Sequence, residues 1–184
     1  QPQYDLRKQQ DRKILLWVEC SRSSGVDYDV QEKLMATCQV YLTKEVKINP
    51  ENIILQQPTS ENETLLDPVK VAQGLGAGYV LLIQVEDYGL GPIGTQTCYS
   101  GEMVTRTVLM DTDLSMAVWP KDPVGKVVHI DVDMETKGRD AALSRLVSST
   151  AHCILRYLHP CEKLKFKTLD EKFTIQDALE IETF

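Results

Sequence analysis

The sequence predicts an α/β domain whose mixed sheet has about five to six strands and whose helices pack mainly on one face. In the first half of the chain, strand and helix patterns alternate, whereas strand patterns follow one another in the second half. The run Tyr79–Val85 has one polar side chain, which is typical of a strand buried on both faces. In Ala142–Leu158, apolar residues recur every three or four positions, which indicates a helix covering the sheet. The expected order is β-α-β-α-β-β-β-β-α.

Two strand–helix units make up the first half. The apolar run Lys13–Glu19 predicts the first strand, and a Ser- and Gly-rich loop leads from it to a helix at about Asp27–Lys44. Asn49-Pro50 interrupts the helical pattern before a second strand at Asn52–Gln57. One face of the predicted helix carries apolar residues at helical spacing, namely Val30, Leu34, Cys38 and Tyr41 or Leu42.

A short helix precedes the central strand. Asp67 and Pro68 are typical of an N-cap and a first helical residue, and Gly76 or Gly78 is expected to end the helix. These glycines follow a helix and precede a strand, which is the reverse of their order in a phosphate-binding loop. We therefore expect them to terminate the helix rather than to bind an anion.

The second half predicts an antiparallel addition to the sheet after a glycine-rich connection, Gly89–Gly101. Strand Glu102–Asp111 is expected to pair with Leu114–Trp119 through the turn Asp111-Thr112-Asp113, with Val104, Val108 and Met110 on one face. Apolar and polar residues then alternate in Lys126–Glu135. This alternation predicts inward Val128, Ile130, Val132 and Met134 and outward His129, Asp131 and Asp133.

Three segments are expected along the chain. Residues 1–12 are polar and predict an N-terminal tether, 13–160 form the α/β domain, and 161–184 form a charged C-terminal extension. The extension predicts a short helix at Thr174–Ile181. Its apolar residues Phe173, Ile175 and Leu179 would pack on the domain or on a partner.

Charge and cysteine content restrict the function. A net charge of −7 and a pI near 5.0 argue against nucleic-acid binding, which needs clustered Lys and Arg. The five cysteines form no CxxC pair, and no cofactor motif is present, so we expect no cofactor. Cys38 and Cys153 fall at apolar positions of predicted helices, whereas the remaining three, Cys20, Cys98 and Cys161, leave room for one disulfide.

The sequence contains one candidate metal site and one candidate ligand pocket. His129, Asp131 and Asp133 share one strand face at roughly 6 to 7 Å spacing, so they could converge on a metal ion. A solvated outer face of an edge strand would show the same pattern. The loops Ser21–Gly25 and Gly89–Gly94 could border a pocket for a small ligand or for peptidoglycan.

Two stretches resemble a superfamily of bacterial envelope proteins. Ala72–Val85 is similar to an A-x-x-L-G-A-x-Y-V-L-x-I-x-V pattern with Gly74 inserted, and Glu102–Trp119 resembles strands that flank an aspartate-containing turn and end near a tryptophan. The superfamily includes the periplasmic part of the curli secretion channel, lipoprotein activators of penicillin-binding proteins, and the N-terminal domain of TolB. The resemblance extends over Lys13–Leu158, but Gly89–Gly101 is too short to supply the channel's membrane-spanning hairpins.

The resemblance implies a non-catalytic domain that binds another envelope component and is lipid-anchored through an N-terminal cysteine absent from this sequence. We therefore expect an extracytoplasmic interaction or assembly module, periplasmic or anchored to the outer membrane, with a cytoplasmic location as the alternative. Its partner would be another envelope protein or a second copy of the chain. Binding is expected at the hairpin and the C-terminal extension, through Asp111, Thr112, Asp113, Phe173, Ile175 and Leu179. The alternative functions are a metal-dependent hydrolase using His129, Asp131 and Asp133, and a small-ligand or peptidoglycan-binding protein.

Overall fold

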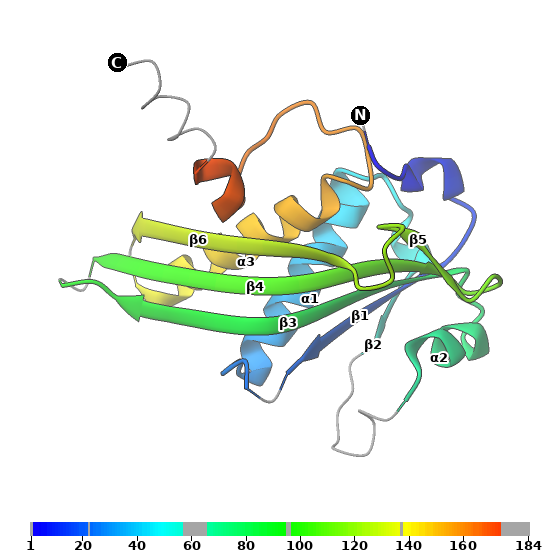
Figure 1. Ribbon diagram of the computed structural model, residues 1–184, viewed down its shortest axis with the longest axis horizontal. Coiled ribbons are helices and arrows are strands. Elements are labelled where there is room, and N and C mark those ends of the chain that lie inside the picture. The colour runs from blue at the N-terminus through cyan, green and yellow to red at the C-terminus, as the bar shows by residue number, and fades with distance from the viewer. Residues whose placement is uncertain (1, 22, 57–65, 95–96, 137, 174–184) are drawn as a thin grey trace.

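The computed structural model describes residues 2–21, 23–56, 66–94, 97–136 and 138–173. Within these residues a six-stranded mixed sheet has the order β2-β1-β3-β4-β5, and β6 pairs with β4 on the same edge as β5. Helices α1 and α3 cover one face of the sheet and α2 lies on the other (Figure 1). The predicted α/β class, with a mixed sheet and helices mainly on one face, is confirmed.

The parallel half of the sheet is centred on β1 (Ile14–Cys20). It lies between β2 (Ile53–Gln56) and β3 (Tyr79–Pro92) and runs parallel to both. The connecting helices are α1 (Tyr28–Lys44) and α2 (Pro68–Gly74). Short 3-10 turns lie at Leu6–Gln9 and Pro50–Asn52. All four apolar positions expected on the inner face of α1 are buried: Val30, Leu34, Cys38 and Leu42.

The long hairpin of β3 and β4 (Cys98–Asp111) differs from the prediction. Both strands have 14 residues, so most of the segment expected as a glycine-rich connection is paired strand. Gly101 lies within β4, where an added Cβ would approach the side chains of Leu146, Leu90 and Met134 to 3.2–3.3 Å. Gly101 therefore allows β4 to pack closely against α3, although glycine in a sequence often indicates a turn. The prediction of a loop at Gly89–Gly101 was wrong for most of this segment.

The face of β4 that enters the main core also differs from the prediction. Met103, Thr105, Thr107 and Leu109 are each 0% exposed, whereas Val104 and Met110 are only partly buried. Val108, at 9% exposed, borders a groove on the opposite face of the sheet. Because the inner face carries Thr105 and Thr107, the even-numbered positions of β4 are more apolar, and the sequence pattern therefore indicated them as the core face. The Thr105 hydroxyl compensates for its burial by donating to the Val128 carbonyl at 3.4 Å.

The remaining elements are β5 (Met116–Trp119), β6 (Lys126–Glu135) and α3 (Arg139–Leu155). In β6 the predicted inward residues Val128, Ile130 and Met134 are buried and Val132 is partly buried against the core, so the predicted alternation is confirmed. Every residue of α3 from Ser149 to Leu155 is buried, so this half of the helix is covered on all sides and not only on the side that faces the sheet. No helix in the described ranges combines the length and the apolar character needed to cross a membrane.

Both chain ends pack on the domain as far as they are described. Residues 2–12 are not a tether: the backbone N–H groups of Gln3 and Tyr4 donate to the Tyr157 carbonyl, and Leu6 is 2% exposed. After α3 the chain reaches a helical turn at 169–173. The predicted helix at Thr174–Ile181, with Ile175 and Leu179, lies outside the described residues. All five thiols are free, which contradicts the alternative of a disulfide among Cys20, Cys98 and Cys161.

We expect the two faces of β4 to differ in their tolerance of truncation. Met103→Ala should lower the free energy of unfolding by about 2–5 kcal/mol because it empties a fully buried position, whereas Val104→Ala should cost under about 1 kcal/mol. Urea unfolding of both variants measures the difference. Equal losses would contradict this assignment of faces.

Candidate functional site

The turn between β4 and β5 is held from inside by Arg12. One guanidinium nitrogen, Nη1, donates to Asp111 Oδ2 at 2.8 Å, and Nη2 donates to Asp113 Oδ2 at 2.9 Å and to the Gly78 carbonyl at 2.8 Å. A Cβ at Gly78 would lie 2.3 Å from Arg12 Nε, so a glycine makes room for this side chain. The guanidinium also lies over the Tyr79 ring, 4.0 Å from its centroid.

This network determines which hairpin residues can meet a partner. Asp111 and Thr112 are 7% and 1% exposed, and the Thr112 hydroxyl donates to the Ala77 carbonyl at 2.7 Å. The hydrogen bond from Arg12 lowers the pKa of Asp111, so the carboxylate stays charged. Of the three hairpin residues expected to bind a partner, only Asp113 has an exposed side chain. Asp111 and Thr112 hold the turn together.

Of the C-terminal candidates, Phe173 lies on a helical turn beside the outer edge of β6. Phe173 is 54% exposed, and Ile175 and Leu179 lie outside the described residues. The turn that carries Phe173 is fastened by Arg156, whose guanidinium donates to both oxygens of Glu171. From the same turn, the Lys172 ammonium donates to the Asp131 carbonyl. Phe173 is therefore presented to solvent from an anchored turn.

The outward face of β6 carries His129, Asp131 and Asp133 as predicted, but the structure does not gather them around one point. His129 Nε2 lies 2.6 Å from Glu102 Oε1 of the neighbouring strand. Among the described residues, no group of three or more His, Cys, Asp or Glu side chains could hold a metal ion. The pattern fits a solvated strand face with one cross-strand pair.

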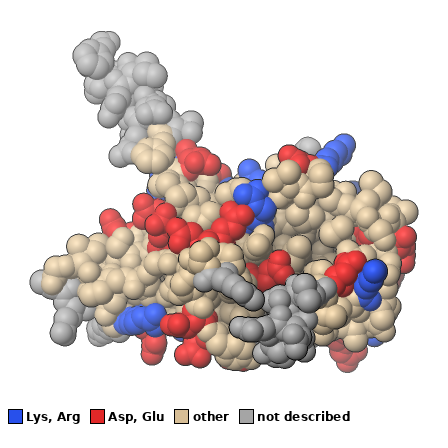
Figure 2. Space-filling view, turned by 60° about the horizontal axis from the view of Figure 1, so that its bottom comes forward, with Lys and Arg blue, Asp and Glu red and all other residues tan. Residues whose placement is uncertain are grey.

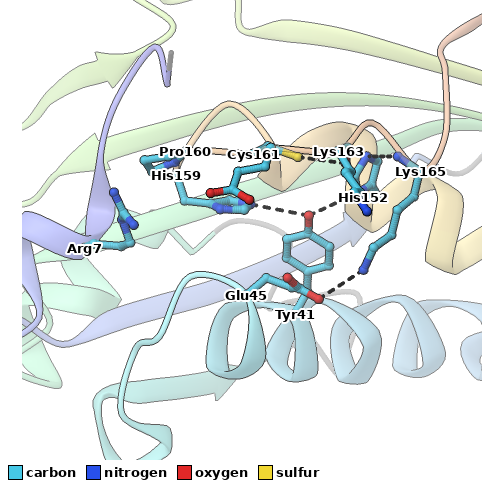
Figure 3. Close-up of a pocket in the computed structure, with 10 residues that line it drawn as sticks. Arg7, Tyr41, Glu45, His152, His159, Pro160, Cys161, Lys163 and Lys165 are labelled. Atoms are coloured by element: carbon cyan, nitrogen blue, oxygen red, sulfur yellow. Dashed lines mark hydrogen bonds and ion pairs between the residues drawn. The ribbon is translucent and has the colours of Figure 1, made fainter.

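A cavity of about 300 Å³ lies where α1, the end of α3 and the following segment meet (Figure 3). It does not include the loops Ser21–Gly25 and Gly89–Gly94. The cavity is lined by two histidines, a tyrosine, a cysteine and charged side chains at its rim: His152, His159, Tyr41, Cys161, Arg7, Glu45, Glu162, Lys163 and Lys165, together with Pro160. No sequence motif predicted this cavity, although His152 and Tyr41 occupy inward helical positions whose polar groups need partners.

The hydrogen bonds of this cavity have a defined direction. The Lys165 backbone N–H donates to His152 Nε2 at 3.2 Å, so the proton of a neutral imidazole is on Nδ1. That Nδ1–H donates to the Tyr41 oxygen at 3.0 Å. The Tyr41 hydroxyl is then free to donate to His159 Nε2, 3.4 Å away (Figure 3). The chain of donors and acceptors is satisfied only while both histidines are neutral.

Electrostatics favour these neutral forms. Burial lowers the pKa of His152 to about 4, and the positive charges of Arg156 and Lys165 act in the same direction. Burial also lowers the pKa of His159 and raises that of Tyr41. Because the polar atoms at the floor bind one another, the arrangement fastens the segment after α3 onto α1. We call it the histidine latch, formed by Tyr41, His152, His159 and Lys165.

The rim of the cavity carries charges of both signs. The Lys165 ammonium lies 3.1 Å from Glu45 Oε1 and lowers the pKa of that carboxyl. Both side chains are well exposed, so this ion pair adds little stability. The Cys161 thiol donates to the Lys163 carbonyl at 3.3 Å. The rim therefore links α1 to the segment after α3, as the floor does.

No protein-family model matches the sequence, and no curated protein matches it. Solved structures do match the fold. A PelC dodecamer from Paraburkholderia phytofirmans has a TM-score of 0.50 at 12% identity, covering 86% of this chain and 91% of the PelC chain. Lipoprotein GNA1162 from Neisseria meningitidis has a TM-score of 0.45 at 15% identity, covering 78% and 99%. TolB from Acinetobacter baumannii has 0.35 at 10% identity, covering 79% of this chain and 28% of TolB.

The fold resembles that of a PelC subunit. At 12% identity the similarity concerns the fold alone. The envelope superfamily inferred from Ala72–Val85 and Glu102–Trp119 stays a prediction.

Removing the Arg12 side chain should loosen the hairpin turn. We expect Arg12→Ala to lower the free energy of unfolding by about 2 kcal/mol, because the buried Asp111 carboxylate would lose its positively charged partner and the donor to Oδ2. Urea unfolding measures the loss. Arg7→Ala is the matched control, since Arg7 pairs with Asp5 at the surface, and a loss as large as that of Arg12→Ala would contradict the assigned role.

The histidine latch should make stability depend on pH. The pKa of His152 is about 4 in the fold and about 6.5 when unfolded, so below pH ~6.5 the unfolded chain binds more protons. Stability should hold above that pH and fall as the pH drops towards 5. Chemical unfolding across this range measures the slope.

His152→Gln should flatten the slope, because glutamine keeps an acceptor for Lys165 N–H but does not titrate. An identical slope in His152→Gln and the unmodified chain would contradict the latch as its source.

Proposed function

We propose that this chain is a non-catalytic extracytoplasmic module that works by assembly, with copies of itself and with another component of the cell envelope. The observation that carries the proposal is the shared fold with PelC, which was solved as a dodecamer and which matches nearly the whole length of both chains. The lipoprotein neighbours support an envelope location. A lipid anchor attached ahead of Gln1 belongs to the same proposal.

The surface of the hairpin region supports an assembly role. Four large apolar side chains in the stretch from the turn after β4 to the start of β6 are well exposed: Leu114 at 64%, Val124 at 61%, Met116 at 53% and Val127 at 42%. Exposed apolar surface is typical of a region that binds protein. Asp113 lies next to Leu114, so this surface retains part of the hairpin site expected from the sequence.

A non-catalytic role is favoured by the condition of the polar groups. In the cavity of the histidine latch, the imidazoles and the phenol bind one another and the backbone. A general base needs a free acceptor facing a substrate, whereas here His152 uses both ring nitrogens within the fold. These groups serve the packing of the chain.

Self-assembly can be measured directly. We expect sedimentation velocity of the purified chain to show a species larger than the monomer whose fraction rises with concentration, because apolar surface is buried on association. Crosslinking in a cell-envelope extract, followed by mass spectrometry, should place crosslinks in the hairpin region. A chain that stays monomeric at all concentrations and gives no crosslinks above a denatured control would contradict the proposal.

A further inference from the structure

A shallow apolar groove of about 450 Å³ lies on the face of the sheet that carries α2. Its floor is formed by side chains of β3 and β4, and its rim by β5 and the loop after it. We call it the loop patch, defined by Leu82, Val108, Met110, Met116, Lys121 and Pro123. Lys121 is exposed and forms no ion pair with a described residue. The loop patch therefore combines apolar surface with one unpaired positive charge.

A second groove, of about 520 Å³, lies between α1 and the β2 edge of the sheet. We call it the helix patch, defined by Asp29, Glu32, Lys33, Met35, Ala36 and Leu55. Asp29 and Glu32 are exposed, and Leu55 is 38% exposed. The Lys33 ammonium is directed to the Asp140 carbonyl at 3.4 Å. The helix patch therefore combines apolar surface with a net negative charge.

The position of the two patches restricts how they could be covered. The helix patch lies on the α1 side of the sheet and the loop patch on the α2 side, so one copy cannot bring its own two patches together. Two copies can, if the loop patch of one meets the helix patch of the next. Such a contact is heterologous: it uses different surfaces of each copy and so continues into a ring or a filament.

Charge favours contact between a loop patch and a helix patch over contact between two identical patches. The chain has a net charge of −7, and acidic side chains spread over more of the face shown in Figure 2 than basic ones do. Two copies therefore repel unless their contact pairs opposite charges. Lys121 against Asp29 and Glu32 supplies such a pair, whereas two helix patches would set carboxylates against carboxylates.

The open edges of the sheet are poorer surfaces for self-association. The Asp131 carbonyl of β6 is occupied by the Lys172 ammonium, and Asp131, Asp133 and Glu135 put negative charge along that strand. A lysine at the edge and repeated like charges both oppose the addition of a strand. At the opposite edge, β2 has only 4 residues.

From these observations we infer that the loop patch of one copy binds the helix patch of another, with Lys121 facing Glu32 and Asp29, so that copies join head to tail. This inference rests on the proposed self-assembly and names the surfaces through which it occurs. The partner of each patch is a second copy of this chain.

Charge reversal tests the inference. Lys121→Glu and Glu32→Lys should each weaken association by about tenfold or more, because each puts like charges in contact. The matched controls are Lys70→Glu and Glu51→Lys, which make the same reversals at exposed residues outside both patches. The controls should associate like the unmodified chain in sedimentation velocity.

Mixing the two variants gives the decisive result. In an equimolar mixture of Lys121→Glu and Glu32→Lys chains, every head-to-tail contact between unlike copies again pairs opposite charges, so assembly should return. Assembly of the unmodified chain that neither variant weakens, or a mixture that stays dissociated, would overturn this pairing while leaving self-assembly intact. An unmodified chain that is monomeric at all concentrations would overturn self-assembly itself, and the pairing with it.

Discussion

The antiparallel pairing of β3 with β4 is the constraint on which the rest of the structure depends. It runs the full length of two 14-residue strands and joins the parallel half of the sheet to the antiparallel half. β1 pairs with one edge of this hairpin, and both β5 and β6 pair with the other. Because the strands are long, α3 packs on β3, β4 and β6, and the turn at the end of β4 reaches Arg12.

Polar contacts then fasten the ends of the chain to this frame. Arg12 connects the segment before β1 with the turn after β4, and the histidine latch connects α1 with the segment after α3. Apart from the exposed Asp113 carboxylate, both networks use groups that are buried or half-buried, where an unmet donor or acceptor is costly. Their contribution is to fix positions that apolar packing alone leaves undetermined.

Periodicity predicted the elements well, because α1, β6 and the first half of α3 each bury one face of a regular pattern. It failed where polarity and burial disagree. Thr105 and Thr107 are fully buried, and Gly89, Gly91 and Gly101 lie in strands, so the composition of these stretches indicated the opposite. The candidate site was harder to predict. Arg12 and Asp111 are 99 positions apart in the sequence, and Tyr41 and His152 are 111 apart, so no local pattern indicates that they pair.

The two tryptophans of the chain lie in different layers of the fold. Trp17 belongs to the small apolar cluster under α2, whereas Trp119 lies in the main core, stacked on Tyr157 at 5.7 Å. Its indole N–H also donates to the Gln3 side chain at 2.7 Å. Intrinsic fluorescence therefore contains a separate reporter for each side of the sheet. Replacing either tryptophan by phenylalanine would isolate one signal, so the release of the N-terminal segment can be timed independently of the melting of the opposite layer.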